Sequence, residues 1–238
     1  MPKFKIVKLL ASVFTPDLHI SNSLSIANAL VDLMGKYVGD EPTILPIQQN
    51  APPEIPRILF ESPNKKWALN VSAARSNLFY HGDPFSTDAG MPEAEFASVA
   101  STFFPEFLEV IGSRIQRIAF VSEKLSKQDD ALNYIQKRFC NKEQITEGRP
   151  FFGPESFELH SLKKYTWEDF DINSWVRMKV QSIKTKDGES VPAILLTNDL
   201  NTYSLVEAKS REFSKDEITR FFDKISEELR KIVQLYFD

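Results

Sequence analysis

The sequence predicts an α+β fold made of two similar halves whose strands are mainly antiparallel. Both halves, residues 1–112 and 113–238, follow the order strand, helix, several strands and long amphipathic helix. Short turn sequences join the later strands of each half, and hairpins of this kind make neighbouring strands antiparallel. A hydrophobic content of 42% is ample for a packed core, so we expect compact α+β structure and not a disordered chain.

The first half starts with an apolar strand and an amphipathic helix. Residues 4–15 are rich in Ile, Val, Leu and Phe, which is typical of a strand, and Pro16 ends it. Apolar residues then recur at helical spacing from Leu24 to Tyr37. The following stretch, residues 42–56, is rich in proline. We expect a loop or an edge strand there, because proline has no N–H for a central ladder.

A hairpin and a long helix complete the first half. Residues 58–61 and 67–72 read as two strands joined by a short turn, and residues 77–81 read as a further strand. An apolar stripe predicts a helix over residues 93–111. Pro105 lies within this helix and predicts either a kink or a restart.

The second half repeats the order with a longer hairpin. The predicted elements are a strand over 115–122, a helix over 129–139, and strands over 157–165, 175–184 and 191–197. Asp187-Gly188 is a hairpin turn between the last two strands. Ser214 and Glu217 fit a capping box that starts a final helix over residues 214–236.

The recurring order leaves two interpretations open. One is an internal duplication, in which a seam separates two equivalent halves, and local echoes such as residues 69–72 against 194–197 favour it. The other is chance, because strands and helices often recur in α+β proteins. In either case the arrangement argues against a doubly wound nucleotide fold, whose strands alternate with helices.

Charge, cysteine content and hydropathy exclude several classes of function. The 29 basic and 33 acidic residues give a net charge of −4, which disfavours nucleic-acid binding by the bulk surface. A single cysteine, Cys140, excludes an intrachain disulfide and fits a reducing compartment. The apolar run near the N-terminus contains Lys8 and is too short to span a bilayer. We expect a cytoplasmic protein with no membrane or nucleic-acid partner.

No motif predicts a metal ion or a cofactor. The sequence contains neither a Walker-type loop nor a GxGxxG run, so nucleotide binding through those devices is not expected. The three histidines are far apart in the sequence, whereas metal ligands usually cluster at short spacing. We therefore predict no cofactor and no metal site.

Three residues are the candidates for catalysis. His81 and Asp83 share a loop at a strand end, and a histidine with an aspartate could act as a general base. His160 lies inside a predicted strand and is the other candidate. The competing interpretation is that these are ordinary turn and surface residues, since the sequence provides no partner nucleophile beside them.

Three further residues are candidates for binding. Arg177 and Lys179 share the polar face of one predicted strand and could contact an anionic partner. Trp167 precedes the acidic turn residues Glu168 and Asp169, where aromatic side chains indicate a turn that packs against the protein. The competing interpretation is a solvated strand face and an ordinary surface turn.

Three segments carry a resemblance to a known family. They are the early strand from Lys5 to Leu10, the mid-chain strand from Arg114 to Phe120, and the helix from Ile218 to Ile225 with the terminal Tyr236-Phe237-Asp238. Through them the chain resembles a sporadically distributed family of uncharacterised prokaryotic proteins of about this length. The resemblance implies a two-part α+β structure in a prokaryotic cytoplasm, and it implies no activity.

The leading hypothesis is a non-catalytic binding or regulatory protein. Its small-molecule ligand or protein partner would bind at the seam between the halves, or at an exposed sheet edge by strand addition. We expect residues 42–57, 82–92 and 141–155 to form the rim of the site. The alternatives are a hydrolase that uses a His/Asp site, and a self-assembling structural unit. Exposed antiparallel edges would also allow a homodimer.

Overall fold

One antiparallel sheet of nine strands runs through both halves of the chain. The structure, a computed structural model, describes residues 2–16, 18, 20, 23–39, 41–46, 48, 51–86, 90–150, 152–185, 187–204 and 211–237. The strand order is β2-β3-β4-β5-β1-β6-β9-β8-β7, and every neighbouring pair is antiparallel. This confirms the predicted α+β class with an antiparallel sheet.

The elements follow the predicted order. In the first half they are β1 (Lys5–Phe14), α1 (Ser23–Gly35), β2 (Pro42–Ile44), β3 (Ile58–Glu61), β4 (Trp67–Val71), β5 (Arg75–His81) and α2 (Glu93–Ile111). In the second half they are β6 (Arg117–Lys127), α3 (Ala131–Phe139), the 3-10 turn η1 (Lys142–Gln144), β7 (Glu158–Trp167), β8 (Phe170–Lys184), β9 (Ser190–Thr202) and α4 (Lys215–Phe237).

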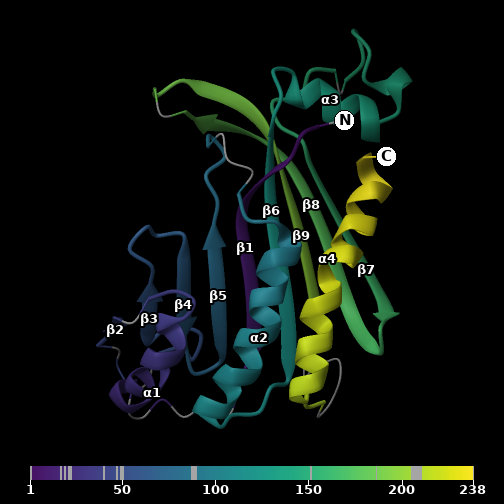
Figure 1. Cartoon of the computed structure of the whole chain (residues 1–238). Helices are drawn as coiled ribbons and strands as arrows, with labels where there is room; N and C mark the ends of the chain where they lie inside the picture. The colour runs from purple at the N-terminus through teal and green to yellow at the C-terminus, as the bar shows by residue number, and fades with distance from the viewer. Residues whose placement is uncertain are drawn as a thin grey trace.

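Helices cover one face of the sheet. Figure 1 shows α1, α2 and α4 over the same face, with α3 at the end of the sheet beside the C-terminal end of α4. Alternate residues along each strand are buried under the helices, such as Leu9, Ala11 and Val13 of β1. We call the opposite face the open face. Its side chains are half-buried or exposed along most of the sheet.

The first strands of the two halves meet at the centre of the molecule. β1 pairs with β6 there, with Leu10 opposite Val121, so the sheet is continuous across residues 112 and 113. Above this pair, α2 and α4 lie side by side (Figure 1). The rings of Phe104 and Phe222 stack between the two helices with their centroids 5.4 Å apart. What the sequence suggested as a seam is therefore a closed ladder beneath packed helices.

Pro105 neither breaks α2 nor restarts it. The helix continues from Glu93 to Ile111 and ends at Gly112, whose φ of 61° is the left-handed conformation of a C-terminal cap. Proline cannot donate a hydrogen bond to the carbonyl four residues earlier, which belongs to Ser101. The Thr219 hydroxyl of α4 donates to that carbonyl instead, at 3.2 Å. The packing of α4 thus satisfies the acceptor that Pro105 leaves open.

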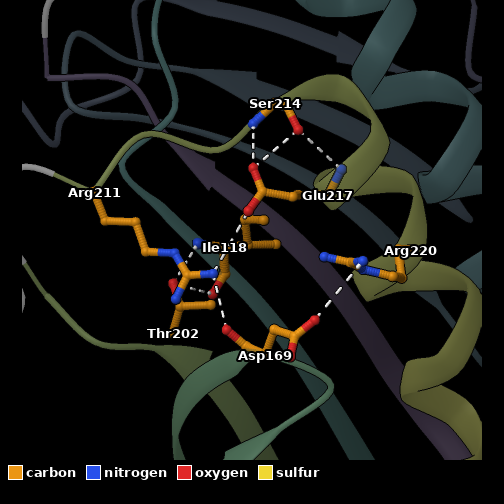
Figure 2. A network of polar contacts seen from close by, with 7 residues as sticks. All are labelled: Ile118, Asp169, Thr202, Arg211, Ser214, Glu217 and Arg220. Atoms are coloured by element: carbon orange, nitrogen blue, oxygen red, sulfur yellow. Dashed lines mark hydrogen bonds and ion pairs between the residues drawn. The ribbon is translucent and has the colours of Figure 1, made fainter.

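The start of α4 is fixed to the turn between β7 and β8. The predicted capping box is confirmed, because the Ser214 N–H donates to the Glu217 carboxylate at 2.8 Å and the Glu217 N–H donates to the Ser214 hydroxyl at 3.3 Å. Arg211 donates to the Asp169 carbonyl at 2.9 Å and lies 3.6 Å from the Glu217 carboxylate. Figure 2 shows these contacts, with Arg220 reaching Asp169 from the helix.

Candidate functional site

The open face is organised as rows of side chains that cross the sheet. Residues directly opposite each other on neighbouring strands place their side chains on the same face. One such row crosses six neighbouring strands and consists of polar or charged residues: His81, Lys8, Glu123, Thr197, Arg177 and His160. The next row is largely apolar and consists of Phe79, Leu10, Val121, Asp199, Trp175 and Leu162.

Cationic side chains lie over aromatic rings between these rows. The guanidinium carbon of Arg177 lies 5.0 Å from the Trp175 ring centroid, and the Lys8 ammonium lies 5.8 Å from that of Phe79. Contacts of this type orient a cation and leave part of its surface available to an anion. The open face therefore combines charged side chains of both signs with apolar surface.

A groove of about 430 Å³ is hollowed into this face over the second half. We call it the open-face groove. Its lining comes from four neighbouring strands and consists of Glu123, Glu158, His160, Arg177, Met178, Lys179, Leu195 and Thr197. Three of the six residues predicted from the sequence, His160, Arg177 and Lys179, are brought together here.

The charges in the groove are only partly matched. Glu123 forms an ion pair with Lys8 at 3.5 Å, and Glu158 lies 3.5 Å from Nε2 of His160. Arg177 lies 3.7 Å from Asp199. Lys179 is exposed and lies opposite Glu158 on β7, but it forms no ion pair among the residues that the structure describes. A negatively charged group that enters between Arg177 and Lys179 would find two donors, one of them unengaged.

The groove does not bring His160 close to the hydroxyl group of its lining. Among the residues that line the groove, Thr197 carries the hydroxyl group. The strand that carries Arg177, β8, lies between Thr197 on β9 and His160 on β7. Two strand spacings correspond to about 10 Å, which is far beyond the hydrogen-bond reach that proton transfer requires. The arrangement is suited to holding a ligand by charge and shape.

The other predicted residues lie elsewhere. His81 is at the opposite end of the polar row, about 24 Å from His160 by five strand spacings, and its ring stacks on Phe79. The Asp83 carboxylate accepts the Phe85 N–H at 2.8 Å, within the loop after β5. Trp167 lies on the helix side, where its ring packs edge-on against Phe221 at 5.7 Å.

The loops predicted to form the rim do not line the groove. None of the described residues in 42–57, 82–92 or 141–155 belongs to its lining, and residues 47, 49, 50, 87–89 and 151 lie outside the described part. Sequence reasoning also missed Glu123, Leu195 and Thr197. Strand alternation could have placed each of them on one face of its own strand, but only the register brings the strands together.

A second hollow lies on the other side of β7, beneath α4. This helix-side cavity has a volume of about 140 Å³ and is lined by Ser161, Lys163, Tyr165, Ser174, Val176, Glu228, Lys231, Ile232, Leu235 and Tyr236. The Tyr165 hydroxyl donates to the Glu228 carboxylate at 2.6 Å. Burial raises the pKa of Tyr165, and the hydrogen bond to Glu228 raises it further, so this hydroxyl stays protonated at neutral pH.

The residues that the structure describes form neither a metal-binding cluster nor a membrane-spanning helix. Within this part of the chain, no group of three or more His, Cys, Asp and Glu side chains could hold a metal ion. No helix among the same residues is both long enough and apolar enough to cross a membrane. No protein-family model matches the sequence, and no curated protein or solved structure is detectably similar to it.

Proposed function

We propose that the chain is a non-catalytic binding protein whose open-face groove holds an anionic group, a carboxylate or a phosphate, of its ligand or partner. The observation that supports this most directly is that Arg177 and Lys179 lie on the same face of β8, where both line a hollow of about 430 Å³. Lys179 forms no ion pair among the described residues. His160 can add a third donor from β7. Leu195 supplies apolar contact, so the anion would belong to a larger ligand.

We also propose that the two halves descend from an internal duplication. The first strands β1 and β6 pair at the centre, the last strands β5 and β9 flank them, and the long helices α2 and α4 pack together. In the first half, β4 takes the place that β8 has in the second, and its open-face residues are Ala68 and Asn70. Under this proposal the open-face groove with Arg177 and Lys179 is a property that only the second half has acquired.

Calorimetric titration of the whole chain tests the binding proposal. The probes are succinate and inorganic phosphate, which separate a carboxylate site from a phosphate site. We expect at least one of them to bind, and we expect Arg177→Ala and Lys179→Ala each to weaken binding about tenfold, the loss of one charge-assisted hydrogen bond. Lys66→Ala is the matched control, an exposed lysine in the turn after β3.

Two results would contradict the proposal. One is that neither anion binds. The other is that one binds while the Arg177 and Lys179 variants match Lys66→Ala in affinity, which would place the anion elsewhere on the surface.

A further inference from the structure

The two edges of the sheet are built differently. At one edge, β2 has three residues, includes Pro42 and is followed closely by Pro46. Short strands and prolines protect an edge from pairing with another chain. At the other edge, β7 has ten residues, contains no proline and is exposed at Glu158, His160 and Leu162. The sheet is therefore closed to strand addition at β2 and open to it at β7.

The register identifies which backbone groups of β7 are available. The Val180 N–H donates to the Phe157 carbonyl at 3.2 Å, and pairing continues to Trp167 opposite Phe170. In an antiparallel ladder, alternate residues bond to the neighbouring strand while those between them direct N–H and C=O outward. Odd-numbered residues therefore bond to β8, and even-numbered residues such as His160 and Leu162 face outward.

Each face of β7 borders one of the two hollows. On the open face, Glu158 and His160 line the open-face groove. On the helix side, Ser161, Lys163 and Tyr165 line the cavity beneath α4. A strand added beside β7 would direct successive side chains alternately toward these two hollows. In strand-addition sites, pockets for alternate side chains of the added segment determine which sequences bind.

The charges beside β7 favour an acidic occupant over a second copy. Lys163 and Lys231 line the helix-side cavity with Glu228, and Arg177 and Lys179 line the open-face groove with Glu123 and Glu158. Each of these acids has a partner within the protein: Glu228 accepts from Tyr165, Glu123 pairs with Lys8, and Glu158 lies 3.5 Å from Nε2 of His160. Lys163 and Lys179 form no ion pair among the residues that the structure describes. A second β7 strand in symmetric antiparallel pairing would bring Lys163 and its neighbour Lys164 close to their own counterparts, and like charges at opposed positions destabilise a pair of strands. An extended segment with acidic side chains would meet lysines on both faces.

We propose that β7 receives an extended acidic segment of a partner protein by antiparallel strand addition. This inference rests on the proposed function, because it assigns the anion of the open-face groove to a carboxylate side chain of that segment. The outward N–H and C=O groups of β7 supply the backbone hydrogen bonds. The two hollows and their cations supply the preference for sequence.

The probe for this proposal is a capped octapeptide that alternates Glu and Val, and the control peptide alternates Lys and Val. Titration of the ¹⁵N-labelled chain should show binding of the Glu peptide at least tenfold tighter than that of the Lys peptide. Amide exchange should slow at His160 and Leu162 on binding. It should stay unchanged at Ser161 and Lys163, which already bond to β8.

Two variants separate backbone pairing from side-chain contact. Leu162→Pro removes an outward N–H and should weaken binding of the Glu peptide at least tenfold. Leu162→Ala keeps that N–H and should change the affinity no more than about twofold. Thermal unfolding of both variants checks that the sheet is intact, as expected for an edge position whose N–H the ladder does not use. N-methylation of alternate peptide residues gives the same test without altering the protein.

The proposal is overturned if the Glu peptide does not bind or if the Lys peptide binds as tightly. It is also overturned if methylating the N–H groups of odd-numbered peptide residues weakens binding as much as methylating those of even-numbered residues. It is also overturned if light scattering shows the chain dimerising in a way that Leu162→Pro abolishes, because the occupant would then be a second copy. If the Glu peptide does not bind but succinate does, and Lys179→Ala weakens succinate binding, then strand addition is rejected and the groove proposal stands.

Discussion

Ser214 and Glu217 close the first turn of α4 through reciprocal hydrogen bonds. Burial raises the pKa of Glu217, but the hydrogen bonds from Ser214 and the charge of Arg211 outweigh it and hold that pKa below its usual value. A carboxylate whose pKa is lower in the folded state stabilises the fold above its unfolded pKa. That contribution is lost as the pH falls through the folded value.

Ser214→Ala should therefore destabilise the protein by about 1 kcal/mol near neutral pH, the usual cost of losing an N-cap. Near pH 3 the difference should shrink, because a protonated Glu217 accepts the hydrogen bond from the Ser214 hydroxyl, the group that the substitution removes, more weakly. Urea unfolding of both proteins at the two pH values measures this. A destabilisation of equal size at both values would show that the Glu217 charge plays no part in the cap.

At the level of single residues, the sequence predicts local contacts well and distant ones poorly. The capping box was predictable because its two residues lie within one helical turn. Arg177 and Lys179 could be placed on one strand face by alternation alone. Their neighbours Glu123 and Thr197 could not, because these come from other strands and the register between strands is not encoded locally.

Among the elements, α2 depends on its neighbour α4 to tolerate Pro105. The Ser101 carbonyl, which lacks its intrahelical donor, accepts the Thr219 hydroxyl at 3.2 Å. Thr219→Val should destabilise the protein by about 1–3 kcal/mol, because it leaves a buried carbonyl unsatisfied. In a Pro105→Ala background the residue-105 N–H can bond to Ser101, so the same substitution should cost much less.

A double-mutant cycle followed by urea unfolding measures this coupling. Thr102→Val is the matched control, since the Thr102 hydroxyl bonds within its own helix to Ser98 and is exposed. We expect a change within about 0.5 kcal/mol for the control. If Thr219→Val costs the same with and without Pro105, the interhelical hydrogen bond does not compensate for the proline.

Element identity was largely predictable, and element length less so. Hydrophobic periodicity located both long helices within a residue or two of α2 and α4. The strand predicted over residues 175–184 begins earlier, at Phe170. The tight Glu168-Asp169 turn allows β7 and β8 to pair up to Trp167 and Phe170, the residues that flank the turn. Both turn residues adopt positive φ, 48° and 69°. Two-residue turns of this kind usually contain Gly or Asn, so an acidic pair does not predict one from the sequence.

At the scale of the whole molecule, the order of the strands in the sheet could not be predicted from the sequence. Hairpin signals join β3 to β4 and β8 to β9, but nothing local indicates that β1 pairs with β6 at the centre. That pairing makes one sheet of two halves and leaves its open face available across both. The groove exists because β6, β9, β8 and β7 are consecutive in space.

The proposed function places the anionic ligand on the open face of the second half and not on the helix layer. A chemical-shift map of the ¹⁵N-labelled whole chain titrated with succinate tests it most directly. We predict that shifts concentrate at Glu123, Arg177, Lys179 and Thr197, with Ala94 and Arg230, which border a hollow between α2 and α4, unaffected. Shifts centred on Ala94 and Arg230 instead, or no saturable shift at the groove, would contradict this placement of the ligand.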